Sequence, residues 1–237
     1  MDLQPGVIMT IDLNCDMGEL EDAEHEAALM EQITSANIAC GGHAGDEATM
    51  ERTARLAIAR GVHIGAHPSF LDRKNFGRTE MPERGEVLAD IVWDQLMHLD
   101  AIVKKLGGKV KHVKPHGALY NVAVRDKDVA VAIGVGVTRW NPFVTMFGLA
   151  GSSMLDMWRA MGLKVAGEGF ADRRYEEDGT LRSRKLPRAL ITDPQEAAEQ
   201  AVRLARQGNV QTICVHGDTP GAVEILKACR DALRCEA

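Results

Sequence analysis

Short apolar runs rich in β-branched residues alternate along the chain with longer runs of helical periodicity. The short runs have the length and composition of buried strands. Seven of them are predicted as strands: residues 7–13, 36–40, 62–66, 110–114, 143–149, 164–167 and 211–215. The clearest helix lies at 86–106, where apolar residues recur at spacings of three and four. Strands that alternate with helices in this way predict a parallel sheet.

Capping residues mark the ends of two further helices. Asp46 is a good N-cap for a helix that stops at Gly61, and Asp193 begins a helix, with proline at its first position, that ends at Gly208. Residues 128–139 combine β-branched residues with two glycines, so periodicity alone does not separate helix from strand. We predict a helix there because the neighbouring elements alternate.

The 237-residue chain is predicted to form one domain, residues 1–237, because no linker, low-complexity tract or internal repeat divides it. Two architectures accommodate seven βα units: an open doubly wound sheet and a closed barrel. An eight-stranded β/α barrel typically needs about 250 residues, and only seven strands are predicted. We therefore expect an α/β fold with a seven-stranded, distorted TIM-like barrel. In either architecture the chemistry belongs at the carboxyl ends of the strands.

Composition excludes several classes of protein. With 28 Lys+Arg against 34 Asp+Glu the formal charge is −6, which argues against a partner that is nucleic acid or an anionic membrane surface. The longest charge-free stretch, 140–155, is shorter than the ~20 apolar residues of a membrane-spanning helix. No basic and then apolar leader is visible, and the five cysteines contain no CxxC pair. We expect a cytoplasmic protein with reduced thiols.

Polar side chains gather where the predicted strands end. Alternation with a period of two puts Asp12, Asn14 and Asp16 on one face, and one face of a barrel strand is the interior. Four of the eight histidines follow strands. The polar residues of this rim are Asp12, Asn14, Asp16, Glu19, His43, Asp46, His67, Ser69, Lys114, His116, Glu168, Asp172, Arg173, His216 and Asp218.

Each of these residues also has a purely structural interpretation. A lone histidine after a strand is usually a loop or capping residue. Asp46 and Asp218 fit helix N-caps, and Asp12 could close a turn. Cys40, beside the rim, is more often a small buried hydrophobe than a nucleophile. The convergence of so many polar groups favours a functional site, because burying them for packing alone would be costly.

This set of residues suits general acid–base catalysis on an amide or ester. A carboxylate can take a proton from water while Lys114 or Arg173 stabilises the developing oxyanion. The same rim could instead hold a divalent metal. The metal-ligand candidates are Asp12, His43, His67 and His116. Spacing alone does not decide between these alternatives. No GxxxxGK[ST] phosphate loop is present, nor a GxGxxG motif after a strand.

At these residues the sequence closely resembles the LamB/YcsF family, the A subunit of the bacterial ATP-dependent 5-oxoprolinase. Seven segments carry the resemblance, in order across nearly the whole chain: 12–19 (DLNCDMGE), 37–46 (NIACGGHAGD), 65–70 (GAHPSF), 113–121 (VKPHGALYN), 148–152 (GLAGS), 168–175 (EGFADRRY) and 214–220 (CVHGDTP). Several are six or more residues long, so the match is more specific than a lone short motif. The basic segment 182–185 departs from the expected pattern and could alter the pocket wall or a partner contact.

The resemblance implies a distorted β/α barrel related to polysaccharide-deacetylase-like folds. It also implies hydrolysis of 5-oxo-L-proline to L-glutamate, driven by ATP, in a complex with two further subunits, B and C. Asp12 and Asp16 would be the first choices for the base, and Lys114 and Arg173 would face the substrate carboxylate or a phosphorylated intermediate. ATP would bind at an atypical site or with a partner protein. Self-association of the chain is compatible with this picture.

Given this resemblance, we expect the following roles for the rim residues, with Asn121 added. The catalytic set is Asp12, Asp16, His43, His67, Lys114, His116, Glu168, Asp172, Arg173 and His216. The substrate-binding set is Asn14, Glu19, Asp46, Ser69, Asn121 and Asp218. Two other functions stay open: a stand-alone metal-dependent deacetylase or amidase, and a non-catalytic subunit that binds the substrate for an enzyme elsewhere.

Overall fold

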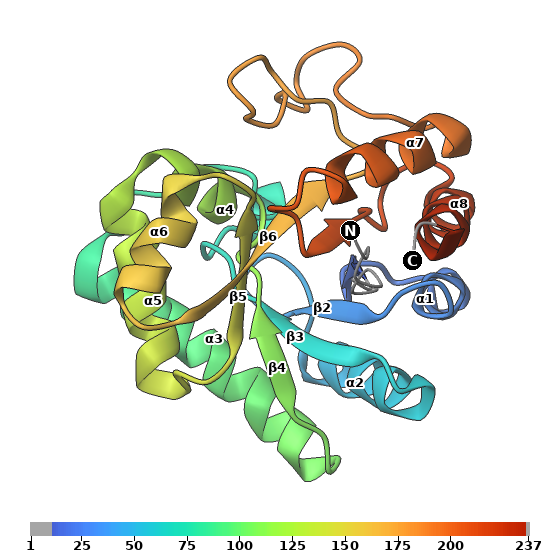
Figure 1. The fold of residues 1–237 in the computed structure, drawn as a ribbon. Coiled ribbons are helices and arrows are strands. Elements are labelled where there is room, and N and C mark those ends of the chain that lie inside the picture. The colour runs from blue at the N-terminus through green and yellow to red at the C-terminus, as the bar shows by residue number, and fades with distance from the viewer. Residues whose placement is uncertain (1–10, 236–237) are drawn as a thin grey trace, which may run out of the picture.

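Seven parallel strands close into a barrel in the computed structural model, which describes residues 11–235 (Figure 1). Neighbouring strands pair in sequence order, and the last pairs with the first to complete the barrel. The strands are β1 (Asp12–Met17), β2 (Ser35–Ala39), β3 (His63–His67), β4 (Val110–Val113), β5 (Thr145–Leu149), β6 (Lys164–Phe170) and β7 (Thr212–Cys214). The expected seven-stranded barrel is therefore confirmed.

Helices surround the barrel (Figure 1). In the described residues they are α1 (Ala23–Met30), α2 (Glu47–Arg60), α3 (Gly85–Lys105), α4 (Gly117–Arg125), α5 (Lys127–Trp140), α6 (Ser153–Ala160), α7 (Pro194–Ala205) and α8 (Ala222–Cys235), with a short 3₁₀ turn η1 (Arg73–Asn75) after β3. α3 packs on α5, and α7 packs on α8. None of the described helices is both long and apolar enough to cross a bilayer.

Most predicted boundaries agree with the structure. Asp46 caps α2 through its side chain, which accepts from the Thr49 amide, and Gly61 ends that helix in the left-handed conformation. The ambiguous run 128–139 is helical, as predicted, within α5. Asp193 caps α7, which ends at Ala205, three residues before the glycine that was expected to end it.

Two strands differ from their predicted ranges by three or more residues at one or both ends, for a shared reason, while the other five differ by no more than two at either end. The first was predicted at 7–13, whereas β1 is Asp12–Met17; residues 7–10 lie outside the described residues. The sixth was predicted to end at residue 167, but β6 continues through Glu168 to Phe170. The predictions followed apolar runs, while these strands carry polar side chains into the barrel, where other polar groups pair with them.

The barrel interior is a polar, hydrogen-bonded core. Asn14 in β1 donates to Glu168 in β6 at 3.1 Å and to Thr212 in β7 at 2.6 Å. Asn37 in β2 donates to Asn14 at 2.8 Å and to Asp16 at 2.9 Å. Because buried polar groups are costly unless paired, these bonds fix β1 relative to its two neighbours β2 and β7 and to β6 beyond them. They also confirm that alternate β1 side chains face the interior.

Two glycines of α5 explain why a sequence so poor in helix formers packs as a helix. A Cβ on Gly136 would lie 2.6 Å from the carbonyl oxygen of Ala89 in α3, and a Cβ on Gly134 would lie 2.7 Å from the sulfur of Met161. The absence of side chains at these positions lets α5 approach its neighbours closely. Tertiary packing therefore overrides the low helix propensity of this segment.

Gly136→Ala tests this close approach. Alanine favours a helix over glycine by about 1 kcal/mol, but here its methyl group would displace α3 backbone, and overpacking costs about 1–3 kcal/mol. We expect a net loss in the free energy of unfolding, measured by urea denaturation. Val131→Ala, on the exposed side of the same helix, is the control and should change stability little. An increase in stability for Gly136→Ala would contradict the packing argument.

Candidate functional site

A cavity of about 620 Å³ opens at the carboxyl ends of the strands. A ligand pocket commonly has this size. Residues at or just beyond the ends of six strands line it: Asp16, His67, Lys114, Leu149, Phe170 and His216. The parallel barrel thus collects side chains from distant parts of the sequence, as the strand-end pattern predicts.

Lys114 lies on the floor of this cavity between acidic groups. Its ammonium donates to Asp16 at 2.8 Å and to Cys214 Sγ at 3.0 Å, and pairs with Glu168 at 3.0 Å. Burial alone would lower the pKa of Lys114, but the Asp16 and Glu168 carboxylates outweigh it and hold the pKa well above its usual value. The cavity floor therefore carries a fixed positive charge.

Asp16 is ionised because its neighbours outweigh the effect of burial on its pKa. Burial alone would raise its pKa, but His67 and Lys114 hold the pKa well below its usual value. One carboxylate oxygen faces Lys114, and the other lies 3.3 Å from Nε2 of His67. A carboxylate with so low a pKa is a weak proton acceptor at neutral pH.

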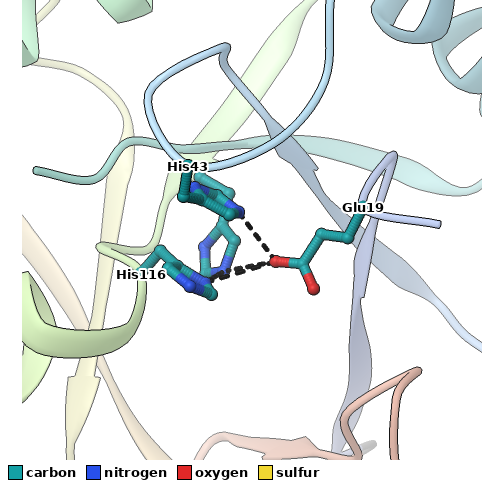
Figure 2. A group of neighbouring side chains, drawn as sticks. Glu19, His43 and His116 are labelled. Carbon is teal, nitrogen blue, oxygen red and sulfur yellow. Dashed lines mark hydrogen bonds and ion pairs between the residues drawn. The ribbon is translucent and has the colours of Figure 1, made fainter. Parts of the chain in front are cut away.

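Glu19 and three histidines form a second cluster beside this floor (Figure 2). Oε1 of Glu19 lies 2.9 Å from Nε2 of His43, 3.2 Å from Nδ1 of His116 and 3.7 Å from Nε2 of His67. The His43 and His116 rings stack with centroids 3.6 Å apart. One atom from each of the four side chains lies within 4.8 Å of the others, so together they could hold a metal ion.

An Asp–His pair reaches the cavity from the opposite side. Nδ1 of His216 lies 3.0 Å from a carboxylate oxygen of Asp172, which also accepts from the His216 amide and from the Thr219 hydroxyl. Burial would raise the pKa of Asp172, but these hydrogen bonds and the His216 ring hold it below its usual value. His216 lines the cavity while Asp172 is buried behind it, so the carboxylate orients a ring that a ligand can reach.

The outer wall of the cavity is basic. Asp218 pairs with Arg78, from the loop after η1, and with Arg184, at 2.7 Å. Arg184 belongs to the β6–α7 segment (residues 171–193), whose loops project from the barrel in Figure 1. Part of the basic segment 182–185 therefore forms the cavity wall, one of the two roles considered for it.

Arg173, at the start of the same segment, also lines the cavity. Its guanidinium donates to the carbonyl of Arg182 at 2.6 Å. Burial, with the nearby Arg184, lowers the pKa of Arg173 to about 10, so it stays charged at neutral pH. Its buried Nε atom has no hydrogen-bond partner within the described residues.

The structure brings most of the predicted rim together. Nine predicted residues line the cavity: Asp16, Glu19, His67, Lys114, His116, Asn121, Arg173, His216 and Asp218. Four others sit behind these and bond to them or to their cluster: Asn14, His43, Glu168 and Asp172.

Three predicted residues lie elsewhere. Asp12 is at the amino end of β1, where it accepts from Thr212 at 2.6 Å and from Ser35 at 2.6 Å. The alternation of side chains along β1 correctly predicts the face on which Asp12 lies, but not its position along the barrel axis. Glu19, rather than Asp12, lies among the histidines. Asp46 is an exposed helix cap, and the Ser69 hydroxyl donates to the Phe70 carbonyl without lining the cavity.

Sequence reasoning missed several residues of the cavity wall. Arg78 and Tyr120 both line it. Arg78 lies in a loop far from the nearest strand end, where charged residues usually face solvent. Tyr120 lies in segment 113–121, one of those that resemble the family, and nothing else in the sequence pointed to it.

Known proteins resemble this chain in sequence and in fold. Residues 11–237 match the model of the LamB/YcsF family. A relative from Brevibacillus brevis, named as the A subunit of 5-oxoprolinase, is 43% identical over an alignment 239 positions long that covers 94% of each chain. The crystal structure of a lactam utilization protein from Thermus thermophilus has a TM-score of 0.88 at 38% identity and covers 96% of this chain and 97% of its own.

A more distant likeness concerns the fold alone. The catalytic domain of a peptidoglycan N-acetylglucosamine deacetylase from Eubacterium rectale has a TM-score of 0.54 at 13% identity, covering 99% of this chain and 88% of its own. The expected similarity in fold to deacetylase barrels is confirmed. Because the family model and the close relative both span nearly the whole chain, the chain belongs to the LamB/YcsF family.

Proposed function

We propose that this chain is the A subunit of a 5-oxoprolinase, which hydrolyses the cyclic amide 5-oxo-L-proline to L-glutamate with cleavage of ATP to ADP and phosphate. One observation carries the proposal. The Brevibacillus brevis relative, which bears that enzyme's name, is 43% identical to this chain over 94% of both. The Thermus thermophilus protein of the same fold, named for lactam utilization, supports a cyclic amide as the substrate.

The cavity floor supplies the electrostatics that lactam hydrolysis requires. Water loses a proton as it adds to the ring carbonyl, negative charge develops on the carbonyl oxygen, and the bond to the ring nitrogen then breaks as that nitrogen takes up a proton. A preorganised cation beside the carbonyl oxygen stabilises that charge. We assign this role to Lys114, because its ammonium is held in place by Asp16 and Glu168. Arg173, which lines the cavity and stays charged at neutral pH, would bind the substrate carboxylate or a phosphorylated intermediate.

His216 is the best proton acceptor for the attacking water. Its contact with Asp172 fixes the ring through Nδ1, and a ring nitrogen lies within 4.8 Å of Asp16. An imidazole oriented by a buried carboxylate is the arrangement that general bases commonly use. Asp16 has too low a pKa for the task, and Asp12 lies at the other end of β1. The proton-acceptor role therefore moves from these aspartates to His216.

ATP and partner proteins complete the proposed reaction. A five-membered lactam resists hydrolysis, so coupling to ATP makes ring opening favourable. The relatives are named as one subunit of an enzyme, which implies an assembly of several different chains, and we propose the B and C subunits as the partners. The chain has no phosphate-binding loop, so ATP would be bound at an atypical site or with a partner. The five free cysteines support a cytoplasmic location.

Reconstitution tests the proposal. The chain, mixed with candidate B and C subunits, 5-oxo-L-proline and ATP, is expected to form glutamate and ADP in equal amounts, as measured by chromatography. Omitting ATP or any one of the three proteins should abolish glutamate formation. Release of acetate from an N-acetylated polysaccharide by the chain alone, without ATP, would instead identify a stand-alone deacetylase.

His216→Gln tests the proton acceptor within the reconstituted complex. Loss of a general base typically lowers the rate about 10²- to 10⁴-fold. We expect a loss of that size in kcat with little change in KM, because the cationic residues that would hold the substrate are retained. Asp172→Asn should lower kcat as well, since the ring then loses the carboxylate that orients it.

The matched control is His98→Gln, which changes an exposed histidine of α3 and should leave kcat unchanged. Circular dichroism and thermal melting confirm that each variant folds. Full ATP-dependent turnover by a folded His216→Gln complex would remove His216 from the chemistry and favour a chain that only binds the substrate.

A further inference from the structure

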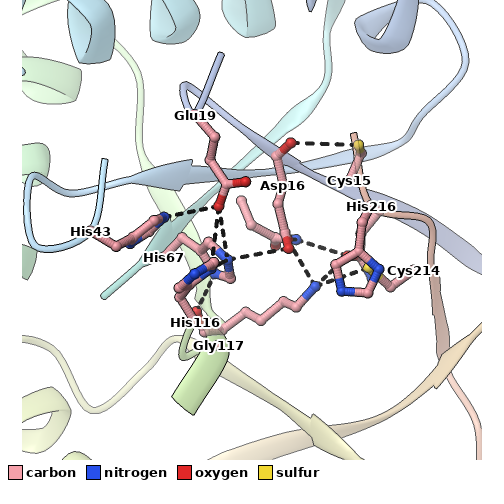
Figure 3. Close-up of polar contacts among 12 residues, drawn as sticks. Cys15, Asp16, Glu19, His43, His67, His116, Gly117, Cys214 and His216 are labelled. Atoms are coloured by element: carbon pink, nitrogen blue, oxygen red, sulfur yellow. Dashed lines mark hydrogen bonds and ion pairs between the residues drawn. The ribbon is translucent and has the colours of Figure 1, made fainter. Parts of the chain in front are cut away.

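We infer that Glu19, His43, His67 and His116 form a binding site for one divalent transition-metal ion. Whether these side chains can bind a metal depends on which ring nitrogens carry protons. The inference does not rest on the proposed reaction, because the geometry of the four side chains is its only basis (Figure 3).

Two backbone carbonyls fix the tautomers of two histidines. Nδ1 of His67 lies 2.7 Å from the carbonyl oxygen of Lys114, and Nε2 of His116 lies 2.9 Å from that of Phe76. A carbonyl oxygen only accepts hydrogen bonds, so both of these nitrogens carry the proton. In neutral rings the other nitrogens, Nε2 of His67 and Nδ1 of His116, therefore present lone pairs.

These two lone-pair nitrogens face each other at 3.0 Å. Oε1 of Glu19, another electron-rich atom, lies 3.2 Å from Nδ1 of His116. Three such atoms at this range repel one another unless a positive charge lies among them. A metal ion or a shared proton would supply that charge. In both histidines the other ring nitrogen is hydrogen-bonded to a backbone carbonyl, as is general for histidines that bind metals.

The spacing fits a metal ion. Four ligands placed tetrahedrally at about 2.0–2.1 Å from zinc lie about 3.3 Å from one another. Within the cluster, four ligand-to-ligand separations are 2.9, 3.0, 3.2 and 3.7 Å.

The ligand types indicate the class of ion. Three imidazoles with one carboxylate suit zinc or a neighbouring first-row divalent ion, rather than calcium or magnesium, which prefer oxygen ligands. Glu19, His67 and His116 line the cavity, while His43 lies behind them. A bound ion would therefore sit at the cavity surface, where it could polarise a carbonyl or bind water.

Metal retention by the purified chain tests the inference without any substrate or partner. After chelation, dialysis, incubation with Zn²⁺ or Co²⁺ and desalting, we expect about one ion per chain by inductively coupled plasma mass spectrometry. The Co²⁺ form should show the visible absorption of a tetrahedral nitrogen and oxygen site. Glu19→Gln and His116→Ala should each weaken binding about a hundredfold or more.

His63→Ala is the control, because His63 is an exposed histidine on the same strand as His67; it should retain the wild-type amount of metal. Circular dichroism checks folding, and Glu19→Gln, which keeps the side-chain size, decides the outcome if His116→Ala does not fold. Wild-type protein that retains no more metal than Glu19→Gln would overturn the inference and leave a proton shared between His67 and His116.

Discussion

The buried ammonium of Lys114 is the constraint on which the site depends. Lys114 is the only buried lysine in the part of the chain that the structure describes, and it sits between the carboxylates of Asp16 and Glu168. Removing one partner of a buried ion pair leaves an uncompensated charge, at a cost of about 3–5 kcal/mol. The ends of β1, β4 and β6 are therefore locked at fixed distances, and the charge on the cavity floor is positioned before any ligand arrives.

The cavity joins surfaces of different electrostatic character. Its floor combines one lysine with carboxylates and the histidine cluster, while arginines dominate the wall around Asp218. An anionic group of a ligand is drawn to the wall and repelled by Glu19, whereas a neutral carbonyl can approach Lys114. This polarity orients a small molecule that is anionic at one end, which describes 5-oxo-L-proline under the proposed function.

The sequence predicts the closed barrel and the gathering of polar groups at one end because both follow from periodicity and parallel topology. It does not predict depth along a strand, so Asp12 is grouped with Asp16 although hydrogen bonds hold it at the opposite end of β1. Nor does it predict contacts made by loops. Arg78 and Arg184 meet at Asp218 only because two loops that are far apart in the sequence cross the same opening.

The cavity is lined partly by barrel residues and partly by loop residues, and this affects how the sequence can change during evolution. Inner residues bond to one another across the barrel, so a single replacement there leaves a partner unsatisfied. The β6–α7 segment contributes Ser183, Arg184 and Lys185 from outside that network. Substitutions and insertions at residues 183–185 can reshape the mouth of the cavity while the inner hydrogen bonds, including those of Asp172 at the start of the same segment, stay intact. Ligand preference and barrel stability are thus separable traits, open to independent change during evolution.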